Sequence, residues 1–131
     1  MKSGRVSEAL EICSRAIEQN ENDVDAWYAL SCIHLRSGSS EKAIESAKRA
    51  CHLSQNQVFH LTHLGTCLVS AGYTADARDV ARLALHSGPS DHFEQSNLGA
   101  LFVACDEHQL GADLFKDALN SDNNNSEYWY N

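Results

Sequence analysis

Small residues return along this chain at a fixed spacing of 34 residues. One series consists entirely of alanine: Ala16, Ala50, Ala84 and Ala118. A second series holds Ala9, Ala43, Ala77 and Gly111, and a third holds Gly4, Gly38, Gly72 and Asp106. A period of this length is typical of stacked supersecondary units and not of a single globular core.

Each period contains two stretches of apolar residues at helical spacing, separated by turn residues. The predicted helices cover residues 6–18, 24–36, 40–52, 58–70, 74–86, 92–105 and 108–119. We expect N-caps at or near Asp23, Ser40, Asn56 or Gln57, Thr74 and Asp91. Gly4 is expected in a turn, and Gly38 and Gly72 just past helix ends, where a left-handed residue is needed. A coiled coil does not fit, because no heptad continues through the glycine and asparagine breaks.

The pattern resembles the tetratricopeptide repeat (TPR) family, whose signature is W-x2-L-G-x2-Y followed by A-x3-F. The first full repeat reads Trp27, Leu30, Ser31, His34, Ala43, Ala47 and Ala50. The second reads Leu61, Leu64, Gly65, Leu68, Ala77, Ala81, Ala84 and Pro89. The third reads Gln95, Leu98, Gly99, Phe102, Gly111, Phe115 and Ala118. The resemblance implies an all-α fold, a right-handed superhelical array of antiparallel helix pairs (a TPR-like α-solenoid), with about three full repeats and partial repeats at both ends.

We expect one domain over residues 1–131, because the loops are short and no linker interrupts the chain. Residues 1–23 correspond to the second half of a repeat, 24–57, 58–91 and 92–125 to full repeats, and 126–131 to the start of a further one. Small residues at Ser31, Gly65 and Gly99 are expected to let paired helices approach closely. Large apolar residues such as Leu98 and Phe102 are expected to fill the space beside that contact.

The two helices of each repeat differ in polarity. The second helices carry charged outer faces, whereas the first helices are apolar or small and neutral almost all round, which predicts that first helices line an inner wall. By resemblance to TPR proteins, this wall is a peptide-binding groove. The predicted groove residues are Tyr28, Cys32, Leu35, Arg36, Phe59, Thr62, Thr66, Val69, Phe93, Ser96, Asn97, Ala100, Val103 and Tyr130.

The aromatic residues of this set predict anchors for an apolar polypeptide segment. They are Tyr28, Phe59, Phe93 and Tyr130. Thr62, Thr66, Ser96 and Asn97 are expected to offer hydrogen bonds to the ligand backbone. Packing between neighbouring first helices explains Leu35, Val69 and Val103 as well as ligand binding does. The lysines and asparagines of a TPR carboxylate clamp are missing from the matching positions, and the asparagine ladder of glycosyltransferase TPR arms is replaced by Ala29, His63 and Asn97.

Charge and cysteine content limit the partners and the cellular location that we expect. The net charge is −8 without a basic stripe, so neither nucleic acid nor an anionic membrane surface is an expected partner. The five cysteines are scattered without a CxxC pair, which favours buried thiols and a cytoplasmic location. No segment has the roughly 18 apolar residues of a membrane span or the apolar core of a signal peptide.

Candidate chemistry is sparse. His60, His63 and Cys67 share one side of a predicted helix, but there is no obvious fourth ligand, so no metal or other cofactor is expected. No phosphate-binding loop, nucleophile elbow or H-E-x-x-H motif occurs, so the chain is not expected to be an enzyme.

Two functions are therefore predicted: a protein-interaction module, or a non-catalytic docking or regulatory arm of a larger enzyme. The second rests on the run Ser126–Asn131, S-E-Y-W-Y-N, which resembles the N-terminal arm of bacterial TPR-containing sulfotransferases. The open ends, helix 6–18 and the residues Tyr128, Trp129 and Tyr130, predict weak head-to-tail self-association. Disorder of the last six residues is the alternative.

Overall fold

A computed structural model describes the backbone of residues 2–130 and the side chains of residues 4–120. Over the described backbone the chain forms seven helices and no strand. Their bounds are α1 Lys2–Gln19, α2 Val24–Arg36, α3 Ser40–Leu53, α4 Val58–Ser70, α5 Thr74–Ser87, α6 His92–Ala104 and α7 His108–Tyr130. None of these helices is both long enough and apolar enough to cross a membrane.

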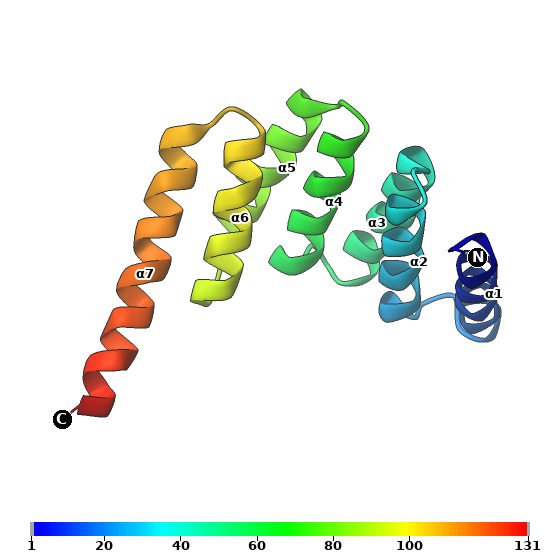
Figure 1. The fold of residues 1–131 in the computed structure, drawn as a ribbon, viewed down its shortest axis with the longest axis horizontal. Coiled ribbons are helices and arrows are strands. Elements are labelled where there is room, and N and C mark those ends of the chain that lie inside the picture. Colours follow the sequence, from blue (N-terminus) through cyan, green and yellow to red (C-terminus); the bar gives the residue numbers. More distant parts are fainter. Residues whose placement is uncertain (1, 131) are drawn as a thin grey trace.

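The helices pack in the order in which the chain forms them (Figure 1). Pairs form between α2 and α3, between α4 and α5, and between α6 and α7. Each second helix also contacts the first helix of the next pair, α3 with α4 and α5 with α6. The first helices touch one another, α2 with α4 and α4 with α6. The predicted all-α array of consecutive antiparallel pairs is therefore confirmed.

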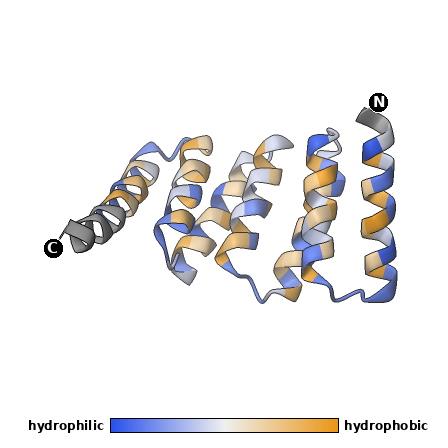
Figure 2. Ribbon diagram, turned by 60° about the horizontal axis from the view of Figure 1, so that its bottom comes forward, coloured by the Kyte–Doolittle hydropathy of each residue, from blue (hydrophilic) through white to orange (hydrophobic). Residues whose placement is uncertain are grey.

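Alanines of the first two 34-residue series lie at the centre of the helix pairs. Ala43, Ala77 and Ala84 are fully buried, and Leu98 and Phe102 are fully buried beside the last crossing. Polar residues, blue in Figure 2, occupy the connecting loops. The buried apolar residues of adjacent pairs join into one continuous core, which explains why a single pair would not be stable alone.

The close approach of paired helices is achieved in two ways. In the first full repeat the Ser31 hydroxyl donates to the carbonyl oxygen of Ala43 over 2.7 Å. In the third, Gly99 faces Gly111, and a Cβ atom added at Gly111 would lie 2.8 Å from the Gly99 carbonyl oxygen. The small residues that the sequence predicts at these positions therefore do lie at helix crossings. Gly65 differs, because a Cβ atom there would collide with Leu101 of α6.

The turn inside each repeat depends on a left-handed residue. Gly38 and Gly72 have φ angles of +83° and +89°, as the sequence predicts. After α2, the Ser39 N–H donates to the carbonyl of His34 over 2.8 Å, which completes a Schellman-type cap. The fourth position of the series holds Asp106, which adopts φ +65° without being glycine.

Two predicted N-caps are confirmed in detail and two are displaced by one residue. The Asp91 side chain accepts a hydrogen bond from the Glu94 N–H over 2.8 Å, and Asp23 caps α2 in the same manner. Ser40 and Thr74 lie next to the caps, as expected of residues at or near them, and each is the first residue of its helix. The caps are Ser39 and Tyr73, since only one residue separates each turn glycine from the helix that follows.

The predictions for the two ends also need correction. Gly4 lies inside α1, so the predicted turn there is wrong; a glycine is tolerated within a helix at a cost of about 1 kcal/mol. The predicted helix end near residue 119 is wrong too, because α7 continues to Tyr130. Residues 120–126 contain no glycine or proline to end a helix. No separate helix starts at residue 126, and the assignment of 126–131 to a further repeat stays a prediction.

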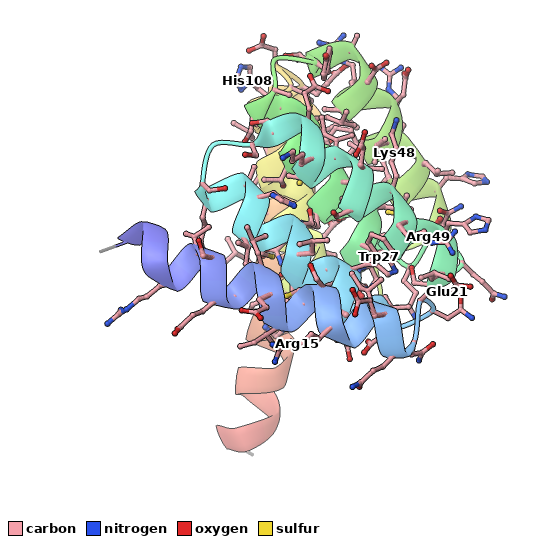
Figure 3. The ribbon with its side chains drawn as sticks, turned by 90° about the vertical axis from the view of Figure 1, so that its right-hand side faces the viewer. Arg15, Glu21, Trp27, Lys48, Arg49 and His108 are labelled. Atoms are coloured by element: carbon pink, nitrogen blue, oxygen red, sulfur yellow. The ribbon has the colours of Figure 1, made fainter. Side chains whose placement is uncertain are left out.

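Polar contacts on the outer side link the repeats. Arg78 of α5 donates to the carbonyl oxygen of Cys105, at the end of α6, over 2.9 Å. Its Nε atom lies 3.5 Å from Glu107, whose carboxylate also pairs with Arg82 at 3.0 Å. At the other end of the array, Figure 3 shows Trp27 next to Glu21, whose carbonyl oxygen accepts a 2.8 Å hydrogen bond from the indole N–H.

Candidate ligand-binding groove

A cavity of about 420 Å³ lies on the side of the array formed by the first helices. Every residue that lines it belongs to α2, α4 or α6. The lining consists of Tyr28, Phe59, Thr62, His63, Thr66, Val69, Ser70, Phe93, Glu94, Asn97, Ala100, Leu101 and Ala104. We refer to this cavity as the groove. Its composition matches the sequence argument that first helices form an inner wall.

Most of the predicted groove residues line this cavity, and five described residues of the set do not. The five are Cys32, Leu35, Arg36, Ser96 and Val103. Leu35 packs against the core and Arg36 is exposed at the end of α2. Cys32 is half-buried. Tyr130 belongs to α7, and its side chain lies outside the described residues.

Val103 and Ser96 face the last helix instead of the groove. A Cβ atom at Gly111 of α7 would lie 2.5 Å from the Val103 Cγ2 atom, which shows that Val103 packs at the α6–α7 crossing. Ser96 lines a second cavity of about 400 Å³ with Phe115 and Leu119. Contact between ligand and any of the predicted residues stays a prediction.

Three aromatic side chains stand along the groove on successive first helices. Phe59 of α4 is 45% exposed, and Phe93, at the equivalent position of α6, is 67% exposed. The ring of Tyr28 on α2 lies 5.0 Å from the ring of Phe59, with an interplanar angle of 55°. Burial, and secondly the Cys32 thiol, raises the pKa of Tyr28 to about 12, so its hydroxyl stays neutral.

A buried polar network supports the wall between α2 and α4. The Ser31 Oγ atom, which donates to the Ala43 carbonyl, lies 2.9 Å from the His63 Nε2 atom and 3.5 Å from the Cys67 Sγ atom. Because the single hydroxyl proton goes to the carbonyl, His63 must carry its proton on Nε2 and donate. The other ring nitrogen of His63, Nδ1, then carries no proton and can accept a hydrogen bond. The ring itself lines the groove. Burial, and secondly His60, lowers the pKa of His63, which favours this neutral form.

His60 and Cys67, which lie close to His63 on α4, are both buried. Only 8% of His60 is exposed, its ring packs edge-on against Phe59 and Tyr28, and its Nδ1 atom has no partner. Cys67 is fully buried, and burial raises the pKa of its thiol. Within the described residues no cluster of His, Cys, Asp and Glu has the geometry of a metal site. The ring of His60 packs against neighbouring aromatic rings, and His63 and Cys67 lie within hydrogen-bonding distance of Ser31.

Five residues of the groove lining are missing from the predicted set: His63, Ser70, Glu94, Leu101 and Ala104. A signal existed for His63, which occupies the same step of the repeat as Asn97, a predicted groove residue. Glu94 lies in the first turn of α6, where an acidic residue is expected for capping alone. Leu101 reaches the groove because Gly65 leaves room for its side chain.

The second cavity marks an uncovered apolar surface at the end of the array. Phe115 and Leu119 of α7 are 37% and 62% exposed. The equivalent residues one repeat earlier are Ala81, which is fully buried, and Leu85, which packs against the core. In the preceding repeats the first helix of the following pair covers the equivalent surface, as α4 packs on α3 and α6 packs on α5.

The fold and the groove define an all-α helical-repeat scaffold. A family model described as tetratricopeptide repeat matches residues 12–45, which is one period of the chain. The resemblance to the TPR family that the sequence predicts is confirmed by this match. The match covers one repeat, and the same period continues over the rest of the chain.

Several solved structures share the fold. A crystal structure of MamA has 19% identity and a TM-score of 0.73, over 98% of this chain and 75% of that one. A second, described as MamA protein, has 19% identity and a TM-score of 0.72, over 98% and 70%. A third, MamA MSR-1 C2, has 18% identity and a TM-score of 0.65, over 95% and 71%. A comparison with curated proteins found no match. At these identities the likeness establishes the fold alone.

Proposed function

We propose that the chain is a non-catalytic protein-interaction module that binds an apolar segment of a partner polypeptide in the groove. The observation that carries this proposal is the exposure of Phe59 and Phe93 on a wall in which Glu94 is the only carboxylate. Aromatic side chains that project from a scaffold are typical anchors in peptide recognition. The groove lining holds no lysine or arginine, which favours a polypeptide over a nucleic acid.

Several neutral polar atoms along the groove suit this role. Thr66 and Asn97 are exposed, and the ring of His63 offers a hydrogen-bond acceptor. The Thr62 hydroxyl donates to the Val58 carbonyl over 2.8 Å, and that of Thr66 donates to the Thr62 carbonyl over 3.1 Å. Both hydroxyls keep lone pairs that can accept hydrogen bonds from a ligand backbone.

A peptide selected from a random displayed library against the intact chain provides the probe. Replacement of Phe59 or Phe93 by alanine is expected to weaken its binding about tenfold or more, because each removes an apolar anchor. The melting temperature is expected to change by no more than about 2 °C, since neither side chain belongs to the buried core. Phe115→Ala, outside the groove, is the matched control and should bind the peptide as the native chain does. Unchanged affinity in Phe59→Ala and Phe93→Ala would refute the proposal.

The alternative proposal places the same groove in a docking or regulatory arm of a larger enzyme, such as a TPR-containing sulfotransferase. It rests on the sequence of Ser126–Asn131. A phosphate-binding loop and a sulfotransferase-like domain encoded beyond Asn131 would favour this alternative, whereas further repeats would favour the scaffold.

Head-to-tail self-association also stays a proposal. It is supported by uncovered apolar side chains at both ends of the array: Ile12 of α1 is 67% exposed, and Leu119 of α7 is 62% exposed. Sedimentation over a range of concentrations, repeated with Leu119→Ser, tests it.

A further inference from the structure

We propose that the partner segment places a lysine or arginine against Glu94, with apolar residues of the same segment along the rest of the groove. This inference rests on the proposed function and specifies the chemistry of its ligand. It follows from the distribution of charge along the groove, from the fixed position of one carboxylate, and from the aromatic rings that flank it.

Glu94 is the charged residue of the groove lining. The rest of the lining is aromatic, aliphatic, hydroxylic, amide or imidazole, and burial, and secondly His60, lowers the pKa of the His63 imidazole. The overall charge of −8 adds to the attraction for a positive segment and repels a negative one. A carboxylate facing a groove without a lysine or arginine in its lining is complementary to a cation supplied by the ligand.

The carboxylate is held in place by the start of α6. The Glu94 Oε2 atom accepts hydrogen bonds from the Ser90 N–H over 2.7 Å and from the Ser90 hydroxyl over 2.9 Å. The Glu94 N–H in turn donates to Asp91, so both ends of the residue are fixed. Both Ser90 bonds go to Oε2, which leaves the lone pairs of Oε1 for another donor. A fixed, partly used acceptor favours binding because little side-chain freedom is lost.

The residues around Glu94 suit a long cationic side chain. Phe93 precedes it and is 67% exposed, and Phe59, one repeat earlier, is 45% exposed. Aromatic faces attract ammonium and guanidinium groups, and the methylene stems of lysine and arginine pack on apolar surfaces. At the opposite end, the groove is lined by Val69, Ser70 and Ala104, which carry no charge. The groove therefore distinguishes its two ends and is expected to fix the direction of a bound segment.

The test uses the full chain and three pools of fluorescent nine-residue peptides. Eight positions carry mixed apolar residues, and the remaining position is lysine, norleucine or glutamate. We expect the lysine pool to bind about five- to tenfold more tightly than the norleucine pool, and the glutamate pool to bind most weakly. The preference for lysine should shrink as the salt concentration rises, because the contact is partly exposed.

The variant Glu94→Gln removes the charge and retains a side-chain oxygen that can accept the Ser90 hydrogen bonds. It is expected to abolish the preference for lysine while circular dichroism and the melting temperature stay close to those of the native chain. Glu45→Gln makes the same chemical change on the exposed side of α3 and should keep the preference.

The outcomes separate the two proposals. Equal binding of the lysine and norleucine pools, or a preference for lysine that survives in Glu94→Gln, overturns the inference and leaves the proposed apolar groove intact. Tightest binding by the glutamate pool also overturns it. Failure of every pool to bind the native chain, at concentrations up to about 1 mM, overturns the inference and the proposed function together.

Discussion

Two helix crossings at the same step of the repeat are built in different ways. Where α2 crosses α3, the Ser31 hydroxyl donates to the Ala43 carbonyl and also reaches His63 on the next repeat. Where α6 crosses α7, Gly99 and Gly111 bring backbone against backbone. The first crossing thus extends a polar network toward the groove, and the last leaves no room for any side chain.

The difference shows what a repeat period specifies and what it leaves open. The period requires a small residue at each crossing, because the helices must approach closely. The group that contacts this small residue differs between repeats. His63 contacts Ser31, Leu101 contacts Gly65, and the backbone of Gly111 contacts Gly99. Those neighbours decide whether the adjoining wall of the groove is polar or apolar.

The largest effect is expected at the glycine crossing. In Gly111→Ala the new methyl group would lie 2.8 Å from the Gly99 carbonyl oxygen and 2.5 Å from the Val103 Cγ2 atom. A backbone oxygen cannot move aside without shifting α6, so the free energy of unfolding should fall by about 2–3 kcal/mol, after allowance for the better helix propensity of alanine. Urea unfolding followed by circular dichroism measures the change.

Two other glycines provide controls for this prediction. Gly4→Ala adds a methyl group with no neighbour within 4 Å and should stabilise the chain by up to about 1 kcal/mol. Gly65→Ala should cost less than Gly111→Ala, because the obstructing Leu101 is a side chain that can rotate. If Gly111→Ala is as harmless as Gly4→Ala, the close approach of α6 and α7 is not as described.

A smaller effect is expected at the polar crossing. Ser31→Ala removes the partner of the His63 N–H and of the Cys67 thiol, and the cost is expected to be about 1–2 kcal/mol of unfolding free energy. Ser87→Ala is a suitable control, because its exposed hydroxyl bonds only to the carbonyl four residues earlier. A loss no greater than that of Ser87→Ala would mean that the network does not stabilise the fold.

The smallest effect is a dependence of stability on pH. Burial lowers the pKa values of His34, His60 and His63 below the ordinary value of 6.5. Below pH 6.5 the unfolded chain therefore binds more protons than the folded chain, and the free energy of unfolding falls as the pH decreases. Urea midpoints at about pH 7.5 and pH 5.5 should show this loss.

Substitution of His63 shows how much this histidine contributes to the pH dependence of the unfolding free energy. His63→Gln keeps a donor for Ser31 but cannot be protonated in this range, so its urea midpoint should change less with pH. Equal slopes in the native chain and in His63→Gln would contradict the prediction.

The sequence predicts the helices well where local signals agree. The bounds of α2 and α4 match the predicted ranges, and Asp23 and Asp91 cap the helices that follow them. Prediction fails where the signal is ambiguous. Gly4 has the repeat position of a turn residue but lies in a helix, and the polar residues after Asn120 do not end α7. Gly4 and the polar residues after Asn120 each lower helix stability only slightly. An effect of that size does not determine where a helix begins or ends.

The groove is predictable in position but not in all its members. Helical periodicity places Thr62, Thr66 and Asn97 on the inner side correctly, because that depends on one helix at a time. Whether a residue reaches the cavity depends also on the distance between neighbouring first helices. Gly65 admits Leu101 between α4 and α6, whereas Cys32 and Arg36 on α2 lie outside the cavity. Such distances depend on packing between repeats, which the period of one repeat does not reveal.

The arginines on the outer side of α5 change how the array can come apart. A chain of nearest-neighbour units can fray from an end, one helix pair at a time. Here Arg78 and Arg82 hold the α6–α7 turn through Cys105 and Glu107. Release of the last pair must break these bonds and expose the core of the pair before it. We therefore expect the last two repeats to unravel in a single step, so that amide protons in α4–α7 exchange with solvent as one cooperative unit.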